Sequence, residues 1–304
     1  AHDYLQAVEL IEKISESTWL NGEYSKLTGW IRVLPEVLVH SRPWLCIWCA
    51  WCFTQTGPLQ DASRWVEAAE QALASQLQDQ SSDLSPNEQA IREEINIIRI
   101  VISSLVQDYD KTLQLALPML EQPPRSNQLS SLIARCNALH GLSSSYYVAG
   151  EFSKAEQICQ ETAELAKDIS FYLRYIHAIH KRSHAMRISG RLHQSFQMLQ
   201  ETLAFLHQQG KHEYFPVSDL YCRLSDLWYE WNNIEEAQRM VEESLKLNEG
   251  MEVPYFYLVG SYNALGRILI AKGGMEKAQD TLQKATNLIQ KSSCWPQLIW
   301  ENET

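Results

Sequence analysis

The sequence lacks the features that mark membrane-spanning, secreted and nucleic-acid-binding proteins. Its 304 positions contain no uncharged apolar run of about 18 residues, so a membrane-spanning helix is not indicated. The first residues, AHDYLQAVELIEK, have no basic stretch followed by an apolar core and a cleavage site. A net charge of −11 argues against contact with a phosphate backbone, which requires clustered Lys and Arg. We therefore expect a cytoplasmic chain that contacts neither a membrane nor a nucleic acid directly.

Recognisable catalytic and cofactor motifs are lacking as well. Neither the phosphate-binding pattern G-x-x-x-x-G-K-[ST] nor the nucleophile pattern G-x-S-x-G occurs. No Ser or Cys lies in the context of a catalytic triad. We therefore expect no catalytic residue, no bound metal and no cofactor in this chain, and no enzyme activity.

The cysteines do not form a disulfide pattern. There are seven, an odd number, and most lie inside apolar helical stretches instead of framing loops. Cys46, Cys49 and Cys52 have the spacing of an iron–sulfur run, but they alternate with tryptophans in WLCIWCAWC. We interpret them as small core residues, and we expect the thiols to be reduced and packed.

A short phrase recurs along the chain and predicts its fold. Each copy ends a helix at Gly or Asn and has a small residue five positions later. The copies are TGPLQDA (56–62), AGEFSKA (149–155), SGRLHQS (189–195), WNNIEEA (231–237) and KGGMEKA (272–278). Glycine, and after it asparagine, most readily adopts the left-handed conformation that ends a helix. The last four small residues are 40, 42 and 41 positions apart, a regular period longer than the roughly 34 of the commonest tetratricopeptide repeat (TPR).

Each phrase predicts an antiparallel pair of helices, and the small residue lets the two helices approach closely. A pair cannot bury its apolar stripe alone, so successive pairs must stack. Two less regular pairs are indicated by Asn21-Gly22, between 1–19 and 23–34, and by Asp108-Tyr109, whose first helix opens after Ser85-Pro86. We expect an all-α, right-handed superhelical solenoid of about seven TPR-like helix pairs. It forms a single domain, 1–304, with an atypical pair in 1–41, repeats in 42–291 and the start of a truncated helix in 292–304.

Two stretches of the chain resemble a known family. They are NGEYSKLTGWIRVLPEVLVHSRPWLCIWCAWCFTQTGPLQDA (21–62) and SDLWYEWNNIEEAQRMVEESL (225–245). They are similar to the sensor region of MalT-like, large LuxR-type transcriptional activators, which belong to the STAND class of signal-transducing ATPases. The resemblance implies a longer parent protein in which a nucleotide-binding ATPase unit and a helix-turn-helix unit flank this sensor as intramolecular partners. ATP, Mg²⁺ and DNA binding would belong to those units.

In TPR arrays the first helix of each pair lines a concave groove, with positions 2, 5, 9 and 12 facing inward. Counting back from the turn residues assigns a polar and aromatic set of candidate ligand-binding residues. They are Asn137, His140, Ser144, Tyr147, His177, His180, His184, Arg187, Asp219, Asp226, Tyr229, Asn263 and Arg267, with Cys222 among them on the third of these helices.

This mixture of donors, acceptors and rings suits a sugar, an amino-acid-like molecule or a short peptide. The hypothesis is an effector-sensing domain, and the alternatives are a TPR scaffold that binds protein partners, a peptide-binding regulator, or simply solvated helix positions. The three histidines share one stripe, but a zinc site would need a fourth ligand. In earlier pairs the same positions are apolar, as at Trp51 and Ile98, and predict either an apolar subsite or a surface covered by another domain of the parent protein.

Overall fold

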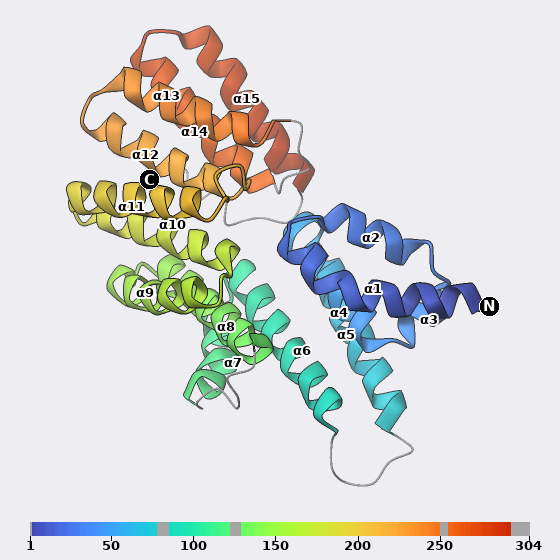
Figure 1. The fold of residues 1–304 in the computed structure, drawn as a ribbon. Helices are drawn as coiled ribbons and strands as arrows, with labels where there is room; N and C mark the ends of the chain where they lie inside the picture. Colours follow the sequence, from blue (N-terminus) through green and yellow to red (C-terminus); the bar gives the residue numbers. More distant parts are fainter. Residues whose placement is uncertain (1, 78–84, 122–128, 250–254, 293–304) are drawn as a thin grey trace. The chain divides into compact units, whose positions relative to one another are not determined.

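The computed structural model describes residues 2–77, 85–121, 129–249 and 255–292, and the predicted truncated helix lies almost wholly outside them (Figure 1). The described residues form helices and no strand, and none of these helices is long and apolar enough to cross a membrane. The helices are α1 (His2–Leu20), α2 (Tyr24–Arg32), α3 (Glu36–His40), α4 (Pro43–Thr56), α5 (Leu59–Leu77), α6 (Pro86–Leu105), α7 (Tyr109–Glu121), α8 (Leu129–Val148), α9 (Phe152–Asp168), α10 (Tyr172–Ile188), α11 (Leu192–Gln208), α12 (Val217–Glu230), α13 (Ile234–Leu247), α14 (Tyr255–Ala271) and α15 (Met275–Ser292).

The all-α class and the succession of helix pairs are confirmed. Within the described residues, seven pairs run from α1/α2 and α4/α5 to α14/α15. The short helix α3 was not predicted. It begins directly after Pro35, whose fixed φ of −57° suits the residue before a helix.

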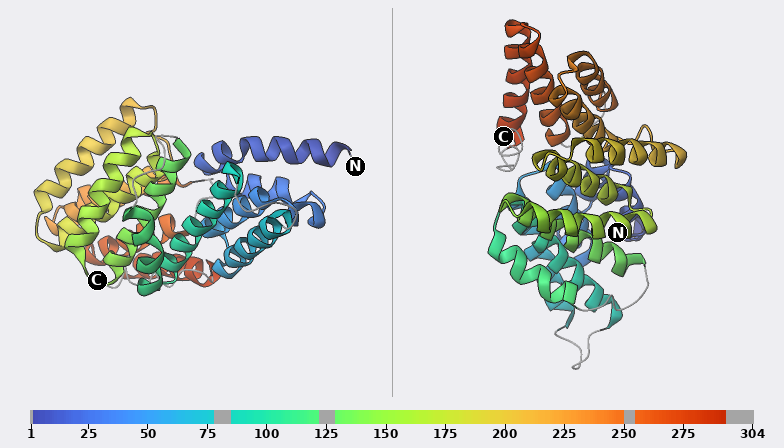
Figure 2. Two further views of the ribbon diagram at one scale, coloured as in Figure 1. Left: turned by 90° about the horizontal axis from the view of Figure 1, so that it is seen from below. Right: turned by 90° about the vertical axis from the view of Figure 1, so that its left-hand side faces the viewer.

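The chain divides into two compact units, Ala1–Gly141 (unit 1) and Leu142–Thr304 (unit 2). In unit 2 two of the second helices each pack against two first helices, α11 against α10 and α12, and α13 against α12 and α14. The first helices α10, α12 and α14 also contact one another in sequence order, and Figure 2 shows these pairs in two further views. The single domain and the right-handed superhelix through the whole chain stay predictions.

Helix starts follow the expected local chemistry. Ser85 accepts a hydrogen bond from the Glu88 backbone N–H (3.3 Å), and the Glu88 carboxylate accepts one from the Ser85 N–H (2.6 Å). This reciprocal cap confirms the predicted start of the long helix α6. Pro43 opens α4, where a missing N–H has no cost. By the same reasoning the sequence predicts that Pro254 opens a helix, but Pro254 lies outside the described residues.

The turn residues of four phrases adopt the predicted left-handed conformation. Their φ angles are 75° at Gly150, 74° at Gly190, 56° at Asn232 and 77° at Gly273. The prediction for Gly57 is wrong, because its φ of −125° is one that any residue adopts. Glycine is needed there for space, since a Cβ at Gly57 would lie 2.1 Å from the Phe53 ring.

The small residues of the phrases are buried between the paired helices. Ala62, Ala155, Ser195, Ala237 and Ala278 are all 0–1% exposed. At two of these positions the close approach is accompanied by a hydrogen bond between the paired helices. Ser183 and Ser195 Oγ atoms lie 2.8 Å apart, and Ser225 Oγ donates to the Ala237 carbonyl at 2.7 Å.

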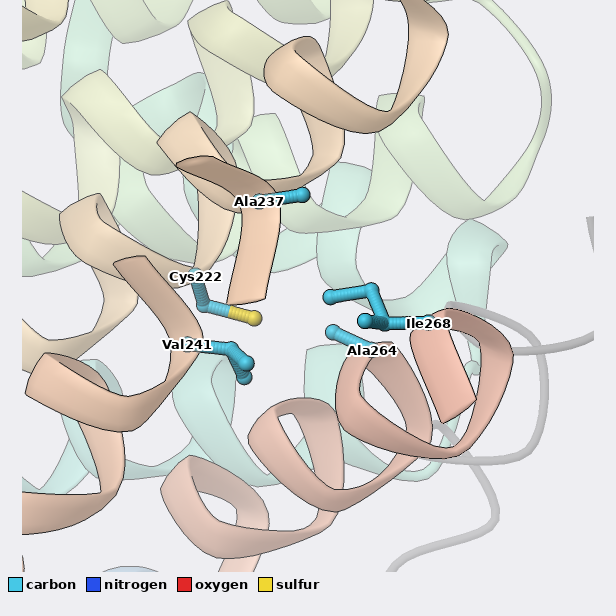
Figure 3. Close-up of a cluster of buried hydrophobic side chains, with 5 residues drawn as sticks. All are labelled: Cys222, Ala237, Val241, Ala264 and Ile268. Carbon is cyan, nitrogen blue, oxygen red and sulfur yellow. The ribbon is translucent and has the colours of Figure 1, made fainter. Parts of the chain in front are cut away.

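Stacking of successive pairs buries apolar side chains between them. Figure 3 shows one such cluster, formed by Cys222, Ala237, Val241, Ala264 and Ile268, each at most 3% exposed. Its members come from α12, α13 and α14, so the second helix of one pair and the first helix of the next share one core. The free thiol of Cys222 acts here as a small apolar core residue, although the inward stripe had placed it beside the candidate ligand-binding residues.

In unit 1 the inward positions of the first helices belong to the core. Ile47 and Ile98 are 0% exposed, and Trp51 is 2% exposed. The Trp51 ring packs on Trp19 of α1, with ring centroids 5.2 Å apart. At Trp51 the helix α1 of the same chain covers the apolar surface of α4. For the other apolar positions the choice between a subsite and a surface covered by another domain stays a prediction.

Candidate functional site

In unit 2 the corresponding first helices carry charged and polar side chains that contact one another. We call this set of side chains the polar face. Its members lie on the end of α8 and on α10, α12 and α14. They are Ser144, Tyr147, Arg174, His177, His180, Lys181, His184, Arg187, Asp219, Arg223, Asp226, Tyr229, Glu230, Tyr257 and Arg267.

At one end of the polar face, His177 connects α10 to α14. Its Nε2 lies 2.7 Å from the Tyr257 hydroxyl, and its Nδ1 lies 3.4 Å from Nη1 of Arg174. A guanidinium only donates, so Nδ1 accepts and Nε2 carries the proton that it donates to Tyr257. Burial, with the nearby charges of Arg174 and Lys181, holds the pKa of His177 well below its usual value. The ring is therefore neutral.

At the other end, His184 connects α10 to α8. Its Nδ1 is hydrogen-bonded to the Tyr147 hydroxyl, and its Nε2 accepts from Nη2 of Arg187 at 3.2 Å. Nη1 of the same Arg187 donates to Glu230 of α12 at 2.7 Å. Burial, and after it the charges of Arg223 and Arg187, lowers the pKa of His184 to about 3. The proton of this neutral ring thus lies on Nδ1, the opposite nitrogen from that in His177.

Asp226 connects α12 to α14 beside His184. Its carboxylate pairs with Arg223 of the same helix at 3.1 Å and with Arg267 of α14. The Arg267 guanidinium also lies over the Tyr229 ring, 5.5 Å from its centroid. Burial raises the pKa of Asp226, but the charges of Arg223, Arg267 and Arg187 together outweigh it and lower the pKa below the usual value. The buried carboxylate is therefore ionised.

His180 lies between these two ends. Its Nδ1 is 3.6 Å from the Asp219 carboxylate, which is too long for a hydrogen bond, and that nitrogen has no hydrogen-bond partner within the described part of the chain. Burial and the charge of Arg223 hold the pKa of His180 well below its usual value. The contact therefore joins a neutral ring to a carboxylate and is not an ion pair.

Lys181 completes the polar face toward α8. Its Nζ donates to the Ser144 hydroxyl and lies 3.5 Å from the Ser143 hydroxyl. Lys181 and Ser144 are both half-buried, so this end of the face is not fully sealed from solvent.

Most of the predicted ligand-binding residues lie together in the polar face. They are more buried than residues on a solvated helix face would be. His177, His184, Asp219 and Asp226 are each at most 9% exposed. Other predicted positions are placed differently. Asn137 (buried) and His140 (half-buried) lie on the part of α8 that belongs to unit 1, and Asn263 (half-buried) is on α14 outside the contacts described above.

Five members of the polar face were missed by the sequence analysis, namely Arg174, Lys181, Arg223, Glu230 and Tyr257. A signal for two of them was present. Arg174 precedes His177 by three positions, and Arg223 precedes Asp226 by three, the spacing at which helix side chains meet. The inward positions taken from the TPR pattern did not include these neighbours.

The histidine stripe is arranged for hydrogen bonding and not for metal ligation. Both ring nitrogens of His177 and of His184 are already in hydrogen bonds, so neither ring has a free lone pair to offer a metal. Among the cysteines, burial raises the pKa of the Cys46 and Cys49 thiols to about 12, which disfavours the thiolate form that a metal or cluster requires.

Unit 1 has a separate open hollow of about 280 Å³ between α5 and α6. It is lined by Glu70, Leu73, Ala74, Arg92, Ile95 and Asn96. Glu70 at its rim is paired with Arg99 at 2.6 Å, and both side chains are well exposed. Its three polar lining residues, Glu70, Arg92 and Asn96, are fewer than the polar side chains of the polar face in unit 2, which we take as the stronger candidate.

Comparisons with known proteins agree with these features. Residues 93–303 match the family model of the MalT-like TPR region. The HTH-type transcriptional regulator MalT of Vibrio cholerae is 22% identical over 95% of this chain and 31% of its own length. The MalT regulator of Vibrio campbellii is 23% identical over 94% of this chain and 30% of its own length. The chain thus spans about a third of the length of these relatives.

A solved structure supports the fold alone. The crystal structure of BtubC (BKLC) from P. vanneervenii superposes with a TM-score of 0.54 at 16% identity, covering 76% of this chain and 89% of that one.

Proposed function

The chain belongs to the family of MalT-like TPR regions, and from this premise we propose that it is the effector-sensing region of a MalT-like, LuxR-type transcriptional regulator. A small molecule binds at the polar face of unit 2. Binding controls the STAND ATPase and DNA-binding units of a longer parent protein, which are the intramolecular partners. The sensing region itself performs no chemistry.

The observation that carries this proposal is the way the polar face joins successive helix pairs. His184, Arg187 and Asp226 belong to contacts that cross from α8 to α10, from α10 to α12 and from α12 to α14. A ligand that replaced or added hydrogen bonds here would change the packing angle between pairs. It shifts the regulator between states only by its difference in affinity for them.

A binding experiment tests the proposal. Common hexoses, the protein amino acids and tripeptides are screened by thermal shift, and each stabilising compound is titrated by calorimetry into the full-length regulator with and without ATP. We expect a compound whose affinity differs between the two nucleotide states. Equal affinity in both states, or no stabilising compound at all, contradicts the sensing role.

A double variant locates the binding site and separates the alternatives. Tyr147→Phe with His180→Gln removes polar groups of the face without deleting a buried charge, and a small molecule held there should lose at least tenfold in affinity. Tyr172→Phe with His193→Gln is the matched control on the same unit. A ligand that spans several pairs, such as a peptide or a partner protein on a TPR scaffold, would lose only part of its affinity.

A further inference from the structure

The hollow of unit 1 has an apolar floor and a polar rim. Leu73 of α5 and Ile95 of α6 line it and are 4% and 2% exposed, so their side chains form the floor. Arg92 and Asn96 of α6 line it as well, and both residues are exposed. An apolar surface with a few polar groups that fix orientation is the usual arrangement of a small-ligand site.

The polar rim offers hydrogen-bond donors that the protein itself does not use. Within the described part of the chain, neither Arg92 nor Asn96 forms a hydrogen bond or an ion pair. The two residues are four positions apart on α6, the spacing at which helix side chains lie side by side. A guanidinium donates two parallel hydrogen bonds to a carboxylate, and the Asn96 amide supplies a further donor. Together they can hold one carboxylate group.

The acidic group of the hollow lies at its other end. Glu70 of α5 is paired with Arg99 of α6 at 2.6 Å, so its charge is balanced within the protein. Arg99 follows Arg92 on the same helix by seven positions, which is about 10 Å at 1.5 Å per residue. The end of the hollow at Arg92 is therefore its positive end, and the Glu70 end disfavours a second carboxylate.

We propose that this hollow is a second binding site of the chain and takes a small monocarboxylic acid with an apolar body. Arg92 and Asn96 bind the carboxylate, and the apolar body lies on Leu73 and Ile95 beside Ala74. The volume of about 280 Å³ lies just below the range of pockets that hold drug-sized ligands, so the acid is small. All of these residues belong to unit 1, and the site does not depend on ligand binding at the polar face.

Acids and their neutral amides test the inference. Phenylacetate and hexanoate are titrated into the chain against phenylacetamide and hexanamide at constant ionic strength, and the thermal midpoint of unfolding is followed. We expect a saturable rise with the acids and at least tenfold weaker binding of the amides, because only the acids have the charge that Arg92 recognises. Equal affinities for an acid and its amide, or no response to either acid, overturn the inference.

Two variants place the acid in the hollow. Arg92→Gln removes the positive charge and should weaken binding of the acids at least tenfold while leaving the amides unchanged. Ala74→Leu keeps the charge but fills the hollow, and should weaken acids and amides alike. Both positions are exposed, so neither variant should unfold the chain. Unchanged affinity for the acids in either variant overturns the inference.

Arg64→Gln is the matched control, because Arg64 is an exposed arginine of α5 in the same unit and pairs with Asp61 at 3.2 Å. It should leave the affinity for the acids unchanged. A loss as large as in Arg92→Gln would mean that the acids are attracted to the surface as a whole, which contradicts a site in the hollow. The Tyr147→Phe, His180→Gln protein should also keep its affinity, and a loss there would place the acids at the polar face instead.

Discussion

The two units use the same helix-pair design but fill the inward positions of their first helices in opposite ways. In unit 1 these positions hold apolar side chains such as Trp51 and Ile98, which are buried in the core. In unit 2 they hold His177, His184 and Asp226, whose hydrogen bonds and ion pairs involve α8, α10, α12 and α14, the first helices of four successive pairs. Apolar burial stabilises a fold directly, whereas buried ionic contacts contribute little net stability. The inward surface of unit 1 thus serves folding, whereas under the proposed function that of unit 2 serves recognition.

The two units also differ in the direction in which burial shifts the pKa of their titratable groups. In unit 1, burial and the nearby Glu16 and Glu93 raise the pKa of Glu94 to about 7, although it accepts a hydrogen bond from the Trp51 indole at 2.7 Å. In unit 2, burial lowers the pKa of His177, His180 and His184. Both groups favour the neutral form, but they predict opposite dependences of stability on pH.

The largest expected effect is on the apolar surface of unit 1. Trp51→Ala removes the packing on Trp19 and the bond to Glu94, and should lower the free energy of unfolding by about 3–5 kcal/mol. Trp44→Ala is the control, because Trp44 is only half-buried and its indole bonds to Asn87 at the surface. Urea denaturation followed by circular dichroism measures both. Equal losses would show that this surface is not a core.

The next effect concerns the buried carboxylate of unit 2. Asp226→Ala leaves the guanidinium of Arg223 buried without its carboxylate, and the loss should be about 3 kcal/mol at neutral pH. Glu236→Ala breaks a surface pair with Arg239 (2.7 Å), and should cost less than about 1 kcal/mol. The same denaturation measurement compares them. A loss for Asp226→Ala as small as for Glu236→Ala would mean that the polar face is open to water.

Glu94→Gln tests the dependence of stability on pH that is expected from unit 1. Because the folded pKa of Glu94 is raised, its contribution to the free energy of unfolding is fully present below the unfolded pKa of 4.5. That contribution is lost as pH rises through about 7. Glutamine still accepts the indole hydrogen bond and has no charge, so it should stabilise the chain by roughly 1–3 kcal/mol at pH 8. At pH 4, below the unfolded pKa, we expect almost no difference. A similar effect at both pH values would rule out titration of Glu94 as the cause.

His184→Gln tests the opposite dependence in unit 2. Because the folded pKa of about 3 lies below the unfolded value of 6.5, only the unfolded chain takes up the proton between these values, and wild-type stability falls as pH falls. The variant should have a shallower slope of unfolding free energy against pH between 6 and 4, by up to about 1.4 kcal/mol per pH unit. His193→Gln, with an exposed ring, is the control. Identical slopes in the two variants would contradict a neutral, buried His184.

The smallest effect concerns the turns of the two units. Gly57 in unit 1 has extended backbone but no room for a Cβ, so Gly57→Asn should cost about 1–2 kcal/mol through the clash with Phe53. Gly190 in unit 2 has a φ of 74° and open space, so Gly190→Asn should cost less than about 1 kcal/mol. Thermal denaturation measures both. The reverse order would mean that conformation, and not space, selects glycine in unit 1.

The fold was largely predictable because the information is local. A left-handed turn residue followed after five positions by a small residue is a short-range pattern, and Asn232 with Ala237 shows that it holds even without glycine. Where the prediction was wrong, at Gly57, the reason for glycine is a contact with a side chain, and spacing alone does not distinguish this from a φ requirement. The additional helix α3 followed from Pro35, which the repeat phrase does not include.

The site was only partly predictable because it depends on neighbours from other pairs. The inward stripe of α10 could be read from the chain, but the hydrogen bond between His177 and Tyr257 joins residues 80 positions apart. No local rule places Tyr257 there. The proton positions on His177 and His184 likewise depend on which nitrogen each arginine reaches.

The sequence by itself determined the helices, their pairing and the residue types offered by each first helix, since turn chemistry and helical period act over a few residues. Only the tertiary structure decided which inward side chains became core and which became a buried network of charged and polar groups. Burial and partner distance set those outcomes, and both arise when distant pairs pack together.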